Sequence, residues 1–129
     1  MSDSSSGGSS SGASTFGARL DAAFGAQGHL CVGIDPHPYL VDAWGYTPDA
    51  EGARDFGLTV IDAVAASGRA GIVKPQVAFF ESHGSAGFAA LEDVLAAARA
   101  AGLLVIGDAK RGDIGSTNDG YAAAWLRAG

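Results

Sequence analysis

The sequence predicts an α/β protein with a parallel sheet, and two features of its pattern support this. Short, largely apolar runs occur at residues 29–34, 71–75 and 103–108, and a segment with helical periodicity follows each of them. The runs do not alternate apolar and polar residues, which is typical of parallel strands buried on both faces. Repeated strand–helix units build either an open doubly wound sheet or a TIM-type (β/α)8 barrel, which needs about 250 residues. As a barrel, these 129 residues form only three to four βα units, and the barrel is incomplete.

The helices are predicted from apolar side chains that recur every three or four residues. Phe16, Leu20 and Phe24 define the first helix, which we expect to end in the glycine-rich residues 25–28. Pro36 and Pro38 end the first strand, because proline continues neither a helix nor a central strand. The expected helices span residues 16–24, 48–68, 85–101 and 117–127.

Residues 1–14 differ in composition from the rest of the chain. They contain eight Ser and three Gly and, apart from Met1, no large apolar side chain. Such a segment buries too little surface to offset its ordering entropy, so we expect a disordered tail. Residues 15–129 are expected to form one domain, which is a partial (β/α) barrel if the barrel alternative holds.

Charge and hydropathy exclude several classes of function. The net charge is −6, and eight scattered Lys and Arg supply no basic face for nucleic acid. The apolar runs fall far short of the ~20 residues that cross a bilayer, so no membrane span is expected. The single cysteine, Cys31, excludes an intramolecular disulfide and fits a cytoplasmic protein. We expect Cys31 to be a small, buried core side chain of the first strand.

Charged side chains collect at the carboxyl ends of all three predicted strands. Asp35 follows the first strand, Lys74 lies at the end of the second, and Asp108 and Lys110 lie at the end of the third. Both candidate architectures place their sites at the carboxyl ends of parallel strands. The chain has only two lysines, and both occur at strand ends, so we expect them to face one cleft.

The spacing around the third strand indicates a chemistry. Asp108 and Lys110 are two residues apart on an extended segment, so their side chains leave the same face. Asp113 follows a predicted turn and is expected to reach back to the site or across to another subunit. Lysines interleaved with acids stay in the ammonium form, since a nearby opposite charge favours the ionised state. An ammonium group donates a proton, which suits the protonation of a carbanion rather than imine formation.

The residues around these lysines resemble a known signature, that of the orotidine 5′-phosphate decarboxylases. The matching positions are Asp108, Lys110, Asp113, Ile114 and Thr117. Segments 33–38 and 74–81 are similar to the bacterial, longer-chain subgroup of that family, and the similarity extends from residue 16 to residue 129. The resemblance implies a homodimeric barrel that converts orotidine 5′-monophosphate to UMP in pyrimidine biosynthesis, with no metal and no organic cofactor.

This resemblance gives each site residue an expected role. Lys110 donates the proton to C6 of the substrate, and Asp108 lies near the scissile carboxylate. Lys74 joins the charge network and contacts the ribose, whose hydroxyls Asp35 binds. The remaining signature residues enter the site of the partner subunit, so that activity depends on dimerisation. They are Asp113, Ile114 and Thr117.

Two alternatives remain open from the sequence. Sugar-phosphate decarboxylases and aldol-type lyases of the same superfamily share the Asp-x-Lys-x-x-Asp pattern and use Mg²⁺, for which Glu81 is the spare acid near a strand end. The second alternative is a non-catalytic fragment that only retains the motifs of an enzyme. The family's phosphate-binding loops follow later barrel strands and have no substitute here, so we expect the chain alone to be inactive and prone to aggregation.

Overall fold

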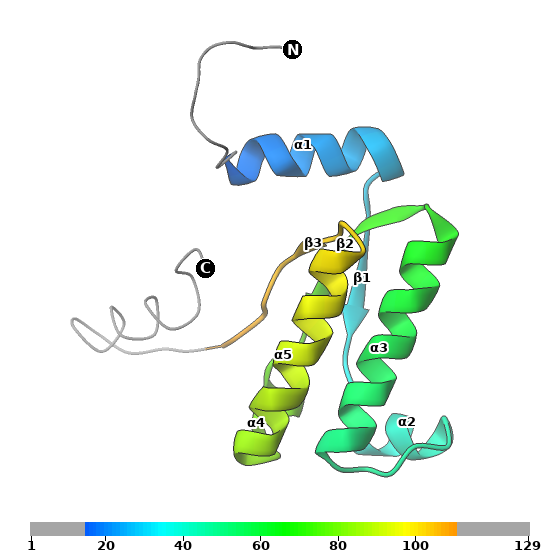
Figure 1. The fold of residues 1–129 in the computed structure, drawn as a ribbon, viewed down its shortest axis with the longest axis vertical. Coiled ribbons are helices and arrows are strands. Elements are labelled where there is room, and N and C mark those ends of the chain that lie inside the picture. Colours follow the sequence, from blue (N-terminus) through cyan, green and yellow to red (C-terminus); the bar gives the residue numbers. More distant parts are fainter. Residues whose placement is uncertain (1–14, 111–129) are drawn as a thin grey trace, which may run out of the picture.

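The computed structural model describes residues 15–110, in which strands and helices alternate (Figure 1). The helices are α1 (Phe16–Gln27), α2 (Pro38–Ala43), α3 (Ala50–Ser67), α4 (Ala78–Glu81) and α5 (Gly84–Ala100). The strands are β1 (Leu30–Ile34), β2 (Ala70–Pro75) and β3 (Leu104–Val105). They form one parallel sheet in the order β1-β2-β3. The predicted α/β fold with parallel strands is therefore confirmed, and over the described residues the sheet is open.

Local sequence explains where the longer helices begin and end. At the start of α1 the hydroxyl of Thr15 accepts a hydrogen bond from the Ala18 N–H at 3.0 Å, and Asp49 caps α3 in the same way through Gly52. Helix α3 ends at Gly68, whose φ of 65° is a left-handed conformation that glycine adopts without strain. The three long helices predicted within the described residues are confirmed, with small shifts at their ends.

The core lies between the sheet and the α3–α5 pair. Helices α3 and α5 run side by side against one face of the sheet (Figure 1). Val73 of the central strand β2 is fully buried, and Ile61 of α3 and Val94 of α5 are almost completely buried as well. Burial of aliphatic side chains of this size stabilises the fold by roughly 1.5–3 kcal/mol each, so this layer holds the strands in place.

Two glycines allow the helices to approach closely. A Cβ atom at Gly57 of α3 would lie 2.6 Å from a methyl group of Val94, so glycine is needed for the α3–α5 contact. A Cβ atom at Gly87 of α5 would lie 1.7 Å from the carbonyl oxygen of Phe80, which belongs to α4. Packing of α4 against α5 therefore depends on the absence of a side chain at position 87.

Strand β1 differs from the prediction in its burial. The strand lies at an edge of the described sheet, and only Ile34, its last residue, is buried. Leu30 is 58% exposed, and Cys31 is exposed too, so the prediction of a buried Cys31 is wrong. The apolar run correctly predicted a strand at β1, but burial also requires packed neighbours on both faces of the strand. Over residues 15–110 such neighbours cover β2 and leave most of β1 exposed.

Two short helices and a shorter third strand also depart from the prediction. Helix α2 begins at Pro38, where proline is favourable as the first helical residue although it ends the strand before it. Helix α4 is a single turn directly after β2. Regular pairing of β3 covers Leu104–Val105 only, and an isolated bridge between Gln76 and Asp108 extends the contact towards the strand end.

Helix α1 crosses the amino ends of the strands, opposite α2 and α4 (Figure 1). No residue of α1 is fully buried, in contrast to α3 and α5. None of the helices found in residues 15–110 is long and apolar enough to cross a membrane. The predicted tail at 1–14 and the predicted helix at 117–127 lie outside the described residues.

Candidate active site

Backbone pairing brings the carboxyl ends of the three strands together. The Gln76 N–H donates a hydrogen bond to the carbonyl of Ile34 at 3.0 Å, which joins the segments that follow β1 and β2. The Asp108 N–H donates to the carbonyl of Pro75 at 3.0 Å, and the Val77 N–H donates to the carbonyl of Asp108 at 3.2 Å. The residues after the strands are therefore held at one edge of the sheet, as the parallel arrangement predicts.

Asp108 lies between the two lysines. Its Oδ2 atom accepts a hydrogen bond from Lys110 Nζ at 2.8 Å and from Lys74 Nζ at 3.1 Å. The side chain of Asp108 is 25% exposed, against 39% for Lys74 and 72% for Lys110. The hydrogen bond from Lys110, and next that from Lys74, holds the pKa of the Asp108 carboxyl below its ordinary value. Asp108 is therefore ionised near neutral pH, and the predicted interleaving of lysines with an acid is present at these three residues.

Gln76 is a fourth member of the cluster and was not among the predicted site residues. Its Nε2 atom donates to Asp108 Oδ2 at 3.2 Å, and its Oε1 atom accepts from Lys110 Nζ at 3.3 Å. Its position after Lys74-Pro75 at a strand end was the available signal. Because the amide of Gln76 is neutral, it adds nothing to the pattern of charged residues in the sequence. Only the side-chain contacts show that Gln76 belongs to the cluster.

Asp35 lies at the same edge of the sheet but makes a different kind of contact. It follows β1, and its carbonyl accepts a hydrogen bond from the His37 N–H at 2.7 Å. Its Oδ1 atom is buried and has no hydrogen-bond partner among the described residues. A buried carboxylate oxygen without a donor is costly, so this atom is suited to a hydroxyl or another donor from a bound ligand.

The loop that follows β1 is also held by an aromatic contact. The imidazole ring of His37 packs against the ring of Phe79 in α4, with centroids 4.1 Å apart, and against Tyr39 at 5.2 Å. Phe79 follows β2, so this contact ties the loop that carries Asp35 to the segment that carries Gln76. His37 itself is partly exposed at this end of the sheet.

The remaining predicted site residues are not placed. Asp113, Ile114 and Thr117 lie outside the described residues, which end at Lys110. Glu81, the acid considered for a magnesium site, lies at the end of α4 and is partly exposed. Within residues 15–110 no group of three or more His, Cys, Asp or Glu side chains is arranged to hold a metal ion.

Two ammonium groups and one carboxylate give the lysine–aspartate cluster a net charge of +1 (+2 from Lys74 and Lys110, −1 from Asp108). The protein as a whole carries −6. A local excess of positive charge in an acidic protein favours an anionic ligand, and the ammonium groups can donate protons. A parallel sheet with charged groups collected at its carboxyl edge is the arrangement of (β/α)-barrel proteins.

Comparison with known proteins defines the family. The model of the orotidine 5′-phosphate decarboxylase / HUMPS family matches residues 28–129, and the chain belongs to this family. It is 52% identical over 115 residues to the orotidine 5′-phosphate decarboxylase of Corynebacterium efficiens, and 51% identical over 112 residues to that of Corynebacterium glutamicum. These matches cover 89% and 87% of this chain, and the chain spans only 40% of the length of each relative.

Solved structures support the same assignment of fold. A crystal structure of a Streptomyces avermitilis protein assigned as an orotidine 5′-phosphate decarboxylase superposes with a TM-score of 0.79 at 54% identity, over 87% of this chain and 39% of the other. The OMP decarboxylase of Leishmania donovani superposes with a TM-score of 0.71 at 34% identity, over 88% of this chain and 40% of the other. The expectation of an incomplete part of a TIM barrel is therefore confirmed.

Proposed function

We propose that this chain supplies part of an active site that decarboxylates orotidine 5′-monophosphate to UMP without a metal or an organic cofactor. The observation that carries the proposal is the position of Asp108 between Lys74 and Lys110 at the strand ends of a member of this family. Loss of carbon dioxide leaves a carbanion at C6, and an ammonium group beside that carbon both stabilises the negative charge and donates the proton.

Lys110 is the proton donor in this proposal. Its side chain is the most exposed of the cluster, and its ammonium group contacts Asp108, so the protein directs a side chain that a ligand can still reach. Asp108 takes the position beside the scissile carboxylate and keeps the two ammonium groups in place. Lys74 completes the network and contacts the ribose. A preformed set of charges needs little reorganisation during the reaction, which is the main source of electrostatic catalysis.

Asp35 binds the ribose hydroxyls. Its buried Oδ1 atom has no partner among the described residues, and a ribose hydroxyl would donate the missing hydrogen bond. Loss of this carboxylate is therefore expected to weaken substrate binding more than it slows the chemical step. The Asp35→Asn variant should raise KM with a smaller effect on kcat.

The rest of the site comes from residues that the structure does not describe. In the proposal, Asp113, Ile114 and Thr117 enter the site of a partner subunit, which makes a homodimer the active form. The relatives are a little more than twice as long as this chain. In the proposal, the phosphate-binding loops belong to the part of them that this chain does not match. A cytoplasmic location fits an enzyme that makes a soluble nucleotide.

A chimaera tests the proposed function. This chain replaces the matching 112 residues of the Corynebacterium glutamicum relative, to which it is 51% identical, and release of carbon dioxide from orotidine 5′-monophosphate is measured. Because the charged cluster is intact, we expect the chimaera to turn over the substrate within about tenfold of the parent's rate. Because the proposed reaction uses no metal, a chelator should leave this rate unchanged.

The 129-residue chain alone is the control, and we expect it to show no turnover. A folded chimaera that binds 6-azauridine monophosphate but releases no carbon dioxide contradicts the proposal. Loss of turnover in chelator favours the Mg²⁺-dependent sugar-phosphate chemistry instead.

A further inference from the structure

Gln76 connects the carboxylate and the ammonium group that the proposed reaction uses. Its amide nitrogen lies 3.2 Å from Asp108 Oδ2, and its amide oxygen lies 3.3 Å from Lys110 Nζ. Asp108 and Lys110 also contact each other at 2.8 Å. The three side chains therefore close a triangle of hydrogen bonds in which Gln76 contacts both charged groups.

The backbone of Gln76 is held more firmly than that of a surface loop. Its N–H donates to the carbonyl of Ile34 at 3.0 Å, and it forms a parallel bridge with Asp108. The residue before it, Pro75, is almost completely buried and has a fixed φ angle. The amide group thus extends from a point fixed to the ends of all three strands, whereas Lys110 has a long side chain that is 72% exposed.

The charges on either side determine how the amide is oriented. With Nε2 towards Asp108 and Oε1 towards Lys110, each end of the amide faces an opposite charge. The reverse orientation would place an NH2 group against an ammonium and a carbonyl oxygen against a carboxylate. A single neutral group with one donor end and one acceptor end satisfies both neighbours and leaves the net charge of the cluster unchanged.

We propose that Gln76 is a positioning residue that fixes the direction of the Lys110 ammonium relative to Asp108 before the substrate binds. This inference rests on the proposed function, because Lys110 is the proton donor there. Holding a flexible lysine near the reacting carbon lowers the entropic cost of reaching the transition state. Gln76 therefore acts on the chemical step through Lys110.

The variants Gln76→Met and Gln76→Glu separate this role from simple packing. Methionine keeps the length and volume of the side chain but removes both hydrogen bonds. We expect Gln76→Met in the chimaera to lower kcat by about 10- to 100-fold, which is the effect of losing a hydrogen bond to a charged group, with KM changed less than threefold. Gln27→Met, the same change in α1 at the opposite end of the sheet, is the control and should leave kcat unchanged.

The pH profile of Gln76→Glu is the more specific readout. When the introduced carboxyl is ionised it repels Asp108, but when protonated it offers one O–H donor and one carbonyl acceptor, as the amide does. We expect the activity of Gln76→Glu relative to the wild-type chimaera to rise severalfold as the pH falls from about 7 to about 4, because this range reaches the ordinary glutamate pKa of about 4.3. Gln76→Met should show no such rise. Equal pH profiles for the two variants overturn the proposal.

A measurement that does not need activity keeps the two proposals apart. The amines of the chimaera are labelled with acetic anhydride at fixed pH, and the rates at Lys74 and Lys110 are measured by peptide mass spectrometry. We expect Gln76→Met to label Lys110 severalfold faster than the wild type, with Lys74 changed less than twofold, because the amide oxygen no longer holds the Lys110 ammonium. Unchanged labelling of Lys110 overturns the role of Gln76. Faster labelling together with a chimaera that releases no carbon dioxide supports that role and contradicts only the proposed function.

Discussion

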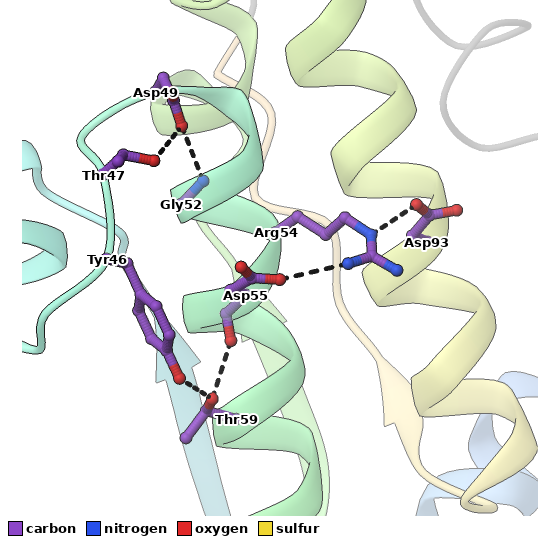
Figure 2. A network of polar contacts seen from close by, with 8 residues as sticks. All are labelled: Tyr46, Thr47, Asp49, Gly52, Arg54, Asp55, Thr59 and Asp93. Atoms are coloured by element: carbon purple, nitrogen blue, oxygen red, sulfur yellow. Dashed lines mark hydrogen bonds and ion pairs between the residues drawn. The ribbon is translucent and has the colours of Figure 1, made fainter.

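Residues 15–110 contain two groups of three charged side chains that are built in opposite ways. In the helix cluster, Arg54 of α3 lies between two carboxylates, with Asp93 of α5 at 2.8 Å and Asp55 at 3.2 Å (Figure 2). In the strand-end cluster, the carboxylate of Asp108 lies between the ammonium groups of Lys74 and Lys110. One cluster has a cation at its centre and a net charge of −1, and the other has an anion at its centre and a net charge of +1.

The surroundings of the two clusters explain why only one is a candidate site. The helix cluster lies over the α3–α5 contact, where its members are 38–56% exposed and apolar packing beneath them already joins the helices. The strand-end cluster lies at the carboxyl edge of the sheet with a more buried centre, since Asp108 is 25% exposed. A buried oxygen of Asp35 without a partner among the described residues lies at the same edge. Position on the fold and unsatisfied groups therefore distinguish a site from a surface ion pair.

Removal of an ammonium group from the strand-end cluster should have the largest effect. We expect Lys110→Ala in the chimaera to lower kcat/KM by about a thousandfold or more, because proton donation and carbanion stabilisation are both lost. Binding of 6-azauridine monophosphate should partly survive. Arg54→Met, which removes the central cation of the helix cluster, is the control. Comparable losses of kcat/KM in the two variants would remove the distinction between the clusters.

Loss of the central charge of the strand-end cluster should have the next largest effect. Asp108→Asn keeps the shape of the side chain but no longer attracts the two ammonium groups. We expect kcat/KM to fall by about a hundredfold, measured by release of carbon dioxide from the chimaera, because the charges are no longer held in their arrangement. An Asp108→Asn chimaera with wild-type turnover would show that the carboxylate is dispensable.

The pH dependence of Asp108 follows from the direction of its pKa shift. Hydrogen bonds from Lys110 and Lys74 lower its pKa below the ordinary value of 3.8, so the folded state favours the ionised form. The resulting stabilisation is complete above the ordinary value and is lost as the pH falls through the lowered one. Carbon-13 NMR of this carboxyl in the chimaera should show no titration between about pH 5 and pH 9. A midpoint above the ordinary value would mean that the lysines do not contact Asp108 in solution.

Packing beneath the helix cluster should matter more than its charges. A Cβ atom at Gly57 would lie 2.6 Å from a methyl group of Val94, so Gly57→Ala should destabilise the chimaera by about 1–2 kcal/mol in urea unfolding, despite alanine's better helix propensity. Gly17→Ala is the matched control in α1, where nothing lies within 4 Å of the added atom. That control should be neutral or stabilise by up to about 1 kcal/mol. Equal effects of the two changes would contradict the close approach of α3 and α5.

The charges of the helix cluster should have the smallest effect. Arg54→Met removes contacts to Asp93 and Asp55, all three of which are well exposed, and exposed ion pairs contribute little. We expect the Tm of the chimaera to fall by a few degrees at most, measured by circular dichroism, with kcat/KM unchanged. A fall as large as that of Gly57→Ala would show that this network, and not the packing below it, joins the two helices.

Much of the fold and the centre of the site could be predicted from the sequence. Periodicity identified the strands and the long helices, and parallel strands with charges at their ends placed Asp35, Lys74 and Asp108 at one edge of the sheet. This placement could be predicted because strands that run in the same direction have their carboxyl ends at the same edge of the sheet. The spacing of Asp108 and Lys110 also predicted that their side chains share a face, since alternate residues of an extended segment do so, and the structure shows them in contact there.

Other features depend on neighbours that a local pattern does not reveal. The exposure of Cys31 depends on which face of β1 is covered, and an apolar run carries no information about that. The proline that ends β1 also begins α2, and only the structure shows both effects. The contacts of Gln76 join side chains more than thirty residues apart in sequence. Asp113, Ile114 and Thr117 stay predictions from the resemblance.

A crystal structure of the chimaera with bound 6-azauridine monophosphate would show where the Lys110 amine lies relative to the pyrimidine ring. The distance to be measured joins Lys110 Nζ to the ring atom that replaces C6. We expect a hydrogen bond of about 2.7–3.2 Å, with Asp108 still between Lys74 and Lys110. A bound nucleotide with the Lys110 amine directed away from the ring and into solvent would contradict it.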